Sequence, residues 1–72
     1  MNKQEREEMK TKVLNFLEQQ EEAVSTQIIT TAIYGDKPSP SQIVAMHVRL
    51  QNMEAKGLIG CFNMGKFMYW QV

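Results

Sequence analysis

The residue types that most often perform catalysis or bind metals are scarce in this chain. Apart from its carboxylates, it contains one histidine, His47, and one cysteine, Cys61. Nucleophilic and metal sites need such residues in clusters, with spacings such as C-x-x-C or H-E-x-x-H, and neither spacing occurs. We therefore expect no enzyme, no metal, no cofactor and no small-molecule substrate. Cys61 is expected to be a small apolar residue in a strand, and His47 to lie at the edge of the core.

The charges give only a small bias toward an anionic partner. Eight Lys and Arg residues balance eight Asp and Glu residues, so the formal net charge is zero. Residues 1–24 carry four cations and six carboxylates, whereas residues 25–72 carry four cations and two carboxylates. Because sequence-independent binding to nucleic acid depends on neutralised phosphates, contacts with phosphate are expected in the second part of the chain.

The length and hydropathy are those of one small domain, residues 1–72, in which 43% of the residues are hydrophobic. There is no apolar run of about 18 residues, which a membrane-spanning helix needs, and the first residues, MNKQEREEMK, are charged. We therefore expect a cytoplasmic protein without membrane contact. A single cysteine agrees with a reducing compartment.

The first half of the chain has the patterns of two helices. Apolar residues recur at helical spacing from Lys3 to about Gln20, and the charged residues between them are expected to form a solvated face with a Glu8–Lys12 pair. Ala23-Val24 is long enough only to pair with an edge of a later hairpin. Ser25 is the expected N-cap of a second helix, which ends at Gly35.

A third helix follows the loop that contains Lys37. Ser39, Pro40 and Gln42 have the pattern of a capping box with proline at the first helical position, and Gly57 is the expected end. The expected buried residues are Ile43, Met46, Leu50 and Met53. The expected outer face consists of Ser41, Gln42, Ala45, Val48, Arg49, Asn52 and Lys56.

The C-terminal part has the alternation of a β-hairpin. Leu58–Phe62 and Lys66–Val72 are the expected strands, and Asn63-Met64-Gly65 is the expected loop. Met68, Trp70 and Val72 are expected to face the core, with Phe67, Tyr69 and Gln71 on the other side. The chain is therefore expected to be an α+β protein with three helices, this two-stranded hairpin and the short strand at Ala23-Val24.

This order of elements is that of a winged helix-turn-helix. The segment RLQNMEAKGLI, residues 49–59, resembles the end of the recognition helix and the start of the wing in repressors of the multiple-antibiotic-resistance type. The residues that carry this resemblance are Leu50, Met53, Glu54, Lys56, Gly57, Leu58 and Ile59. The resemblance implies a winged-helix fold, with the hairpin as the wing, and the function of a small transcriptional regulator that binds duplex DNA.

The closing YWQV also resembles the end of the wing in Z-DNA-binding winged helices, which have a tryptophan where Trp70 stands. Those domains use an asparagine and a tyrosine at the positions of His47 and Gln51, and prolines in the wing. This chain has neither those residues nor a proline in the hairpin. Z-form DNA is therefore not the expected ligand.

In the DNA-binding interpretation, the N-terminal half of the third helix enters the major groove and its side chains contact base edges. A lysine before the helix and a lysine in the wing contact phosphates. The expected DNA-binding residues are Lys37, Ser41, Gln42, Ala45, Arg49 and Lys66.

A protein-interaction module without DNA binding is the alternative. The zero net charge favours it, as do Met64, Phe67 and Tyr69, which are expected to be exposed near the wing. The partner is another protein or a second copy of this chain. We expect a two-fold homodimer, because so small a domain has a thin core and because a dimer presents two recognition helices about 34 Å apart.

Overall fold

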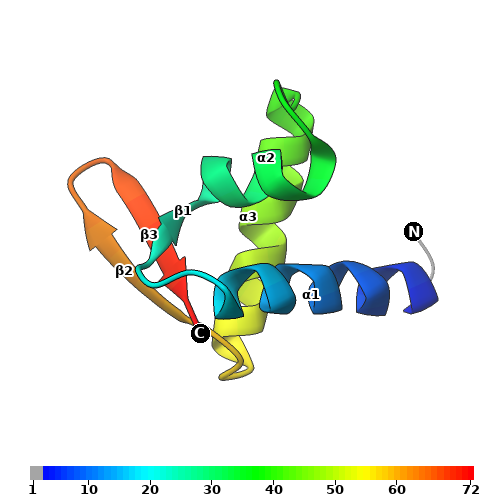
Figure 1. The fold of residues 1–72 in the computed structure, drawn as a ribbon, viewed down its shortest axis with the longest axis horizontal. Coiled ribbons are helices and arrows are strands. Elements are labelled where there is room, and N and C mark those ends of the chain that lie inside the picture. The colour runs from blue at the N-terminus through cyan, green and yellow to red at the C-terminus, as the bar shows by residue number, and fades with distance from the viewer. Residues whose placement is uncertain (1–2) are drawn as a thin grey trace.

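The computed structural model describes residues 3–72, which form three helices and a three-stranded antiparallel sheet (Figure 1). The elements are α1 (Lys3–Glu18), β1 (Val24–Ser25), α2 (Thr26–Tyr34), α3 (Pro40–Ala55), β2 (Gly60–Met64) and β3 (Phe67–Gln71). The α+β class that the sequence predicts is confirmed. In the described part of the chain, no helix combines the length and the hydropathy needed to cross a membrane.

Both predicted N-caps are present and determine where α2 and α3 begin. The hydroxyl of Ser25 accepts a hydrogen bond from the backbone N–H of Ile28 at 3.3 Å. At the start of α3, the hydroxyl of Ser39 accepts from the N–H of Gln42 at 3.2 Å, and the Gln42 side chain accepts from the N–H of Ser39 at 2.9 Å. This is the expected capping box. After α3, Gly57 has a φ of 78°, a conformation that glycine adopts without steric cost.

The hairpin is paired differently from the sequence prediction. β2 begins two residues later than expected and continues through Met64, which pairs with Phe67. The turn is therefore Gly65-Lys66, and the predicted loop Asn63-Met64-Gly65 is wrong. Gly65 has a φ of 68°, which a two-residue hairpin turn requires. The prediction assigned the glycine to the end of the loop, whereas the strands continue pairing up to it.

The third strand lies one residue further along than Ala23-Val24. β1 pairs with β3, with Val24 opposite Trp70 and Ser25 opposite Tyr69. The strand order is β1-β3-β2, so β3 is central. Because Ser25 is both the last residue of β1 and the N-cap of α2, the sheet leads directly into that helix.

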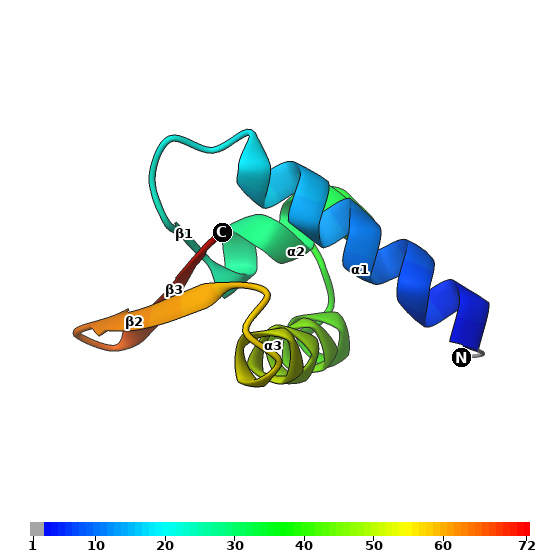
Figure 2. The same ribbon diagram turned by 90° about the horizontal axis from the view of Figure 1, so that it is seen from below.

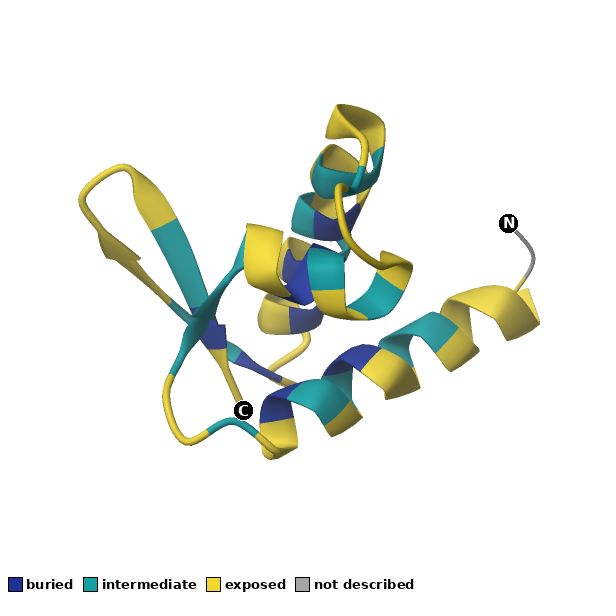
Figure 3. Cartoon of the chain, turned by 45° about the horizontal axis from the view of Figure 1, so that its top comes forward, coloured by how far each residue is buried: buried dark blue, intermediate teal, exposed yellow. Residues whose placement is uncertain are grey.

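The core lies between the helices and one face of the sheet (Figure 3). Its buried apolar residues are Val13, Leu17, Ile29, Met46, Leu50, Met53, Ile59 and Trp70. Three of the four residues predicted for the buried side of α3 are among them, and Ile43 is half-buried. Val72 was predicted to face the core, but it is 58% exposed because β3 ends at Gln71.

Candidate functional site

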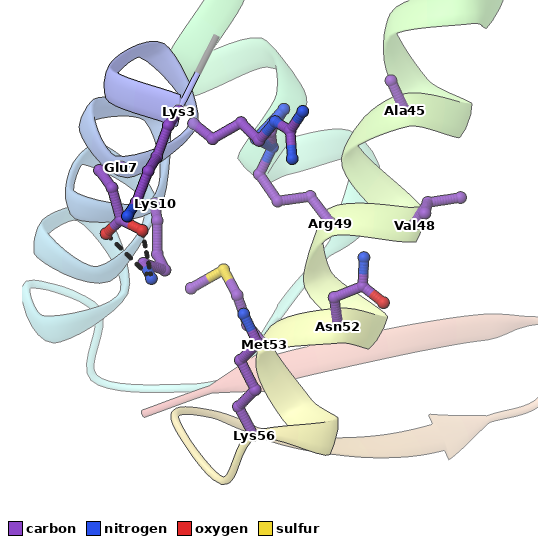
Figure 4. A pocket seen from close by; sticks show the side chains of 10 residues that line it. Lys3, Glu7, Lys10, Ala45, Val48, Arg49, Asn52, Met53 and Lys56 are labelled. Carbon is purple, nitrogen blue, oxygen red and sulfur yellow. Dashed lines mark hydrogen bonds and ion pairs between the residues drawn. The ribbon is translucent and has the colours of Figure 1, made fainter. Parts of the chain in front are cut away.

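A groove of about 530 Å³ lies between the first turns of α1 and the later turns of α3 (Figure 4). Five of the ten described residues that line it are cations: Lys3, Arg6, Lys10, Arg49 and Lys56. Glu7 is the one carboxylate among these lining residues. The walls of the groove therefore have an excess of four positive charges, in a chain whose formal net charge is zero.

Helical spacing brings the α1 cations to the same side of that helix. Lys3, Arg6 and Lys10 follow one another at intervals of three and four residues, at which side chains share a helix face. Lys12 lies off this face and lines a different depression. The sequence prediction of a solvated face missed this site. The spacing is visible in the sequence, but it does not reveal that this side of α1 faces α3.

Glu7 forms an ion pair with Lys10 inside the groove. The Lys10 Nζ lies 3.0 Å from Oε2 and donates a hydrogen bond to Oε1 at 3.2 Å (Figure 4). α1 therefore has this pair in place of the predicted Glu8–Lys12 pair. The hydrogen bond from Lys10 and its charge hold the pKa of the Glu7 carboxyl below its ordinary value, and the charges of Lys56 and Lys3 act in the same direction. This shift comes mainly from the contact with Lys10.

Arg49 lines the groove at the border of the outer face of α3, where Ala45, Val48 and Asn52 line it too. It is half-buried, and its side chain extends from α3 toward α1 (Figure 4). The sequence prediction placed Arg49 on the solvent-facing side together with Ala45. Periodicity identifies the buried side of a helix, but it cannot tell which flank a neighbouring helix covers.

The side of α3 opposite the core is uncharged. We call it the free face of α3, and its exposed residues are Ser41, Val44, Ala45, Val48, Gln51, Asn52 and Ala55. Val44 is 63% exposed and Val48 is 49% exposed. Of the predicted DNA-binding residues, Ser41 and Ala45 lie on this face. Gln42 does not, because it is half-buried and its side chain is held in the capping box.

The two remaining predicted residues, Lys37 and Lys66, are exposed outside the groove. Lys37 lies in the loop before α3, with a φ of 60°. Lys66 lies in the hairpin turn and lines a depression of about 290 Å³ together with Ile43 and His47 of α3. Seen along its axis, α3 has the hairpin on one side and the first turns of α1 on the other (Figure 2). Cations therefore lie on both sides of the free face.

His47 and Cys61 both lie next to Trp70. The His47 ring packs edge-on against the Trp70 ring, with centroids 5.9 Å apart. Cys61 is half-buried and pairs with Trp70 across the sheet. Burial raises the pKa of the Cys61 thiol, and the charge of Glu54 acts in the same direction, so the thiol stays protonated at neutral pH. Among residues 3–72, no three side chains of metal-ligating type are grouped together.

Comparisons with known proteins add no family assignment. No protein-family model matches the chain, and neither does any curated protein or solved structure. The function therefore has to be inferred from the groove, the hairpin and the free face of α3.

Proposed function

We propose that this protein is a winged-helix DNA-binding protein, a small transcriptional regulator whose α3 enters the major groove of duplex DNA. In this proposal the hairpin of β2 and β3 is the wing. The observation that carries the proposal is the distribution of charge around α3. An uncharged free face lies between Lys66 on one side and the five cations of the groove on the other.

The dimensions are compatible with a duplex. A helix with its side chains is about 10–12 Å across, and the major groove is about 12 Å wide. When a helix lies in that groove, the phosphates of the two strands border it on both sides. The longest extent of the molecule, 34 Å, runs from the hairpin to the first turns of α1 (Figure 2). It is long enough for both sets of cations to reach phosphates.

Two kinds of contact follow from this arrangement. Lys3, Arg6, Lys56 and Lys66 would contact phosphates, and such contacts position a protein on DNA without reading its sequence. Lys37, in the loop before α3, would add a phosphate contact near the start of the helix. The exposed residues from Ser41 to Val48 would contact base edges: Ser41, Val44, Ala45 and Val48. Gln42 has no part in base reading, because its amide is held by Ser39.

Two lysines of α1 provide a matched test. Lys3 lines the groove and Lys12 does not, so Lys3→Gln and Lys12→Gln change the same charge on the same helix. We expect Lys3→Gln to weaken binding to labelled duplex DNA in a fluorescence anisotropy titration. The plot of the logarithm of the binding constant against the logarithm of the salt concentration should also have a slope shallower by about one, because one phosphate contact is lost. Lys12→Gln is expected to bind like the parent protein. If the two variants lose the same affinity for DNA, the groove does not contact the phosphates.

The hairpin favours a second candidate function, interaction with another protein. On the hairpin face away from the core, Phe62 pairs with Tyr69, and Met64 pairs with Phe67. The Phe62 and Tyr69 rings are stacked with centroids 6.3 Å apart. Met64 and Phe67 are 57% and 60% exposed. Aromatic residues and methionine are enriched at protein interfaces, and β2 is an edge strand, so a second copy of the chain is the partner that this surface fits.

A further inference from the structure

We infer that the free face of α3 selects A·T-rich duplex DNA, and that Val44 and Val48 contact the methyl groups of thymine. The inference rests on the proposed DNA-binding function and adds the bases that α3 would contact. Its three supports are the side-chain chemistry of the free face, the spacing of the two valines and the position of Arg49.

Each base pair offers different groups in the major groove. Guanine presents two acceptors, which Arg and Lys bind. Adenine presents an acceptor and a donor, which Asn and Gln bind. Thymine presents a methyl group, which apolar side chains contact. The free face of α3, all of which the structure describes, has no Arg or Lys. It has two exposed valines in the part proposed to contact bases, and Gln51 and Asn52 in the turn that follows. Its chemistry therefore fits adenine and thymine, and it lacks the usual partner of guanine.

The two valines are arranged to contact bases two steps apart. Val44 and Val48 are four residues apart, so they lie on the same side of α3 and about 6 Å apart along its axis. That spacing is close to two base-pair steps of about 3.4 Å. Valine is stiff at χ1, which holds its methyl groups in place.

The position of Arg49 removes the one candidate for guanine recognition on α3. It is the single Arg or Lys within Pro40–Ala55. Its side chain is half-buried and extends toward α1, where it lines the groove. Arg49 therefore adds to the positive potential that attracts phosphates, and its guanidinium extends toward α1 from the border of the free face.

The distribution of charge around the free face also favours DNA as its ligand. The free face is uncharged, and cations flank it on both sides. A duplex has the complementary pattern, because its base edges lie between two rows of phosphates.

The test compares three duplexes of equal length: an A·T-rich duplex, a G·C-rich duplex, and the A·T-rich duplex with every thymine replaced by uracil. Uracil lacks only the methyl group. We expect the parent protein to bind the A·T-rich duplex about tenfold more tightly than the G·C-rich one. Replacing thymine by uracil should weaken binding about fourfold for each methyl group contacted.

A double variant identifies the side chains responsible. Val44→Ala with Val48→Ala should bind the thymine and uracil duplexes equally well. Val72→Ala, which truncates an exposed valine outside α3, should retain the difference between them. Thermal unfolding followed by circular dichroism verifies that the variants fold, and the uracil comparison needs only the parent protein.

The outcomes separate this inference from the function on which it rests. If the parent binds all three duplexes with equal affinity, the A·T selectivity is wrong and the DNA-binding function stands. If the double variant still distinguishes thymine from uracil, the assignment of the methyl contacts to Val44 and Val48 is wrong, while the DNA-binding function stands. If the parent binds no duplex at low salt, the proposed function fails and the inference fails with it.

Discussion

The indole N–H of Trp70 donates a hydrogen bond to the hydroxyl of Thr26 at 2.8 Å, which joins the central strand to the first residue of α2. Trp70 is 1% exposed, and its ring also contacts His47 of α3. The sheet, α2 and α3 therefore meet at this side chain. Because the hairpin includes β3, these contacts determine how the hairpin is oriented relative to α3.

Replacing Thr26 by valine tests this connection. Thr26→Val keeps the shape of the side chain but leaves the indole N–H without its acceptor. We expect the free energy of unfolding to fall by about 1–3 kcal/mol, the cost of an unsatisfied buried donor. Urea denaturation followed by tryptophan fluorescence measures it. Thr26→Ser keeps the hydroxyl and should retain more stability; parent-like stability of Thr26→Val would show that the bond is unimportant.

The core of α3 gives a second prediction. Leu50 has no exposed surface, so Leu50→Ala removes methyl groups from a closed environment and should cost about 2–5 kcal/mol. This loss is comparable to the whole stability of a small domain, and we expect the variant to be largely unfolded by circular dichroism. Gln51→Ala, at the next and exposed position, should change stability by less than about 0.5 kcal/mol. A Leu50→Ala protein that melts like the parent would be inconsistent with this core.

The Glu7 carboxylate should oppose DNA binding, because it lies among the cations of the groove. Glu7→Gln is expected to strengthen binding about two- to fivefold at low salt, the range expected for an exposed charge pair. Glu8→Gln makes the same change at the neighbouring position outside the groove and should have a smaller effect. If both variants bind DNA with the same affinity, Glu7 does not oppose DNA binding more than Glu8 does.

The lowered pKa of Glu7 also predicts a pH dependence. Its ion pair with Lys10 is fully formed above the ordinary carboxyl pKa and is lost as the pH falls through the lowered pKa of the folded state. The stabilisation by the pair is lost over that range, while protonation removes a negative charge from the groove. The affinity of the parent for DNA, measured by anisotropy, should therefore rise as the pH falls, more than that of Glu7→Gln. Parallel pH profiles for the two proteins would exclude this effect.

Self-association through the hairpin is a separate prediction. If a second copy covers the exposed face of β2 and β3, sedimentation at micromolar concentration should give twice the chain mass of 8.3 kDa. Phe67→Ser should shift the protein toward the monomer, whereas Ile28→Ser, at an exposed position on α2, should not. A parent protein that sediments as a monomer would rule out the homodimer.

The features that the sequence predicted correctly depend on local interactions. The capping box of Ser39 and Gln42 is formed by residues three positions apart, and helical periodicity identified Leu50 as buried. Trp70 was also placed correctly, because an apolar face is expected to turn its largest residue inward. The hairpin register was predicted wrongly. A three-residue loop and the observed Gly65-Lys66 turn both place Gly65 where a positive φ is needed, so the glycine does not distinguish between them.

The groove could not be predicted, because it depends on how two helices pack. Arg49 and Lys3 are far apart in the sequence, and no pattern within either helix shows that they line the same groove. The net charge of zero also gives no sign of the groove. The carboxylates of Glu18, Glu21 and Glu22 cancel cations in the sum, but they line a different depression at the other end of α1.

The salt dependence of duplex DNA binding tests the proposed function most directly. If each of the five cations proposed to contact phosphates neutralises about one of them, a plot of the logarithm of the binding constant against the logarithm of the salt concentration should have a slope of about −4 to −5. These cations are Lys3, Arg6, Lys37, Lys56 and Lys66. Lys66→Gln should make that slope shallower by about one. A slope near zero, or no binding of the parent protein to duplex DNA at low ionic strength, would contradict the proposal that this protein binds DNA.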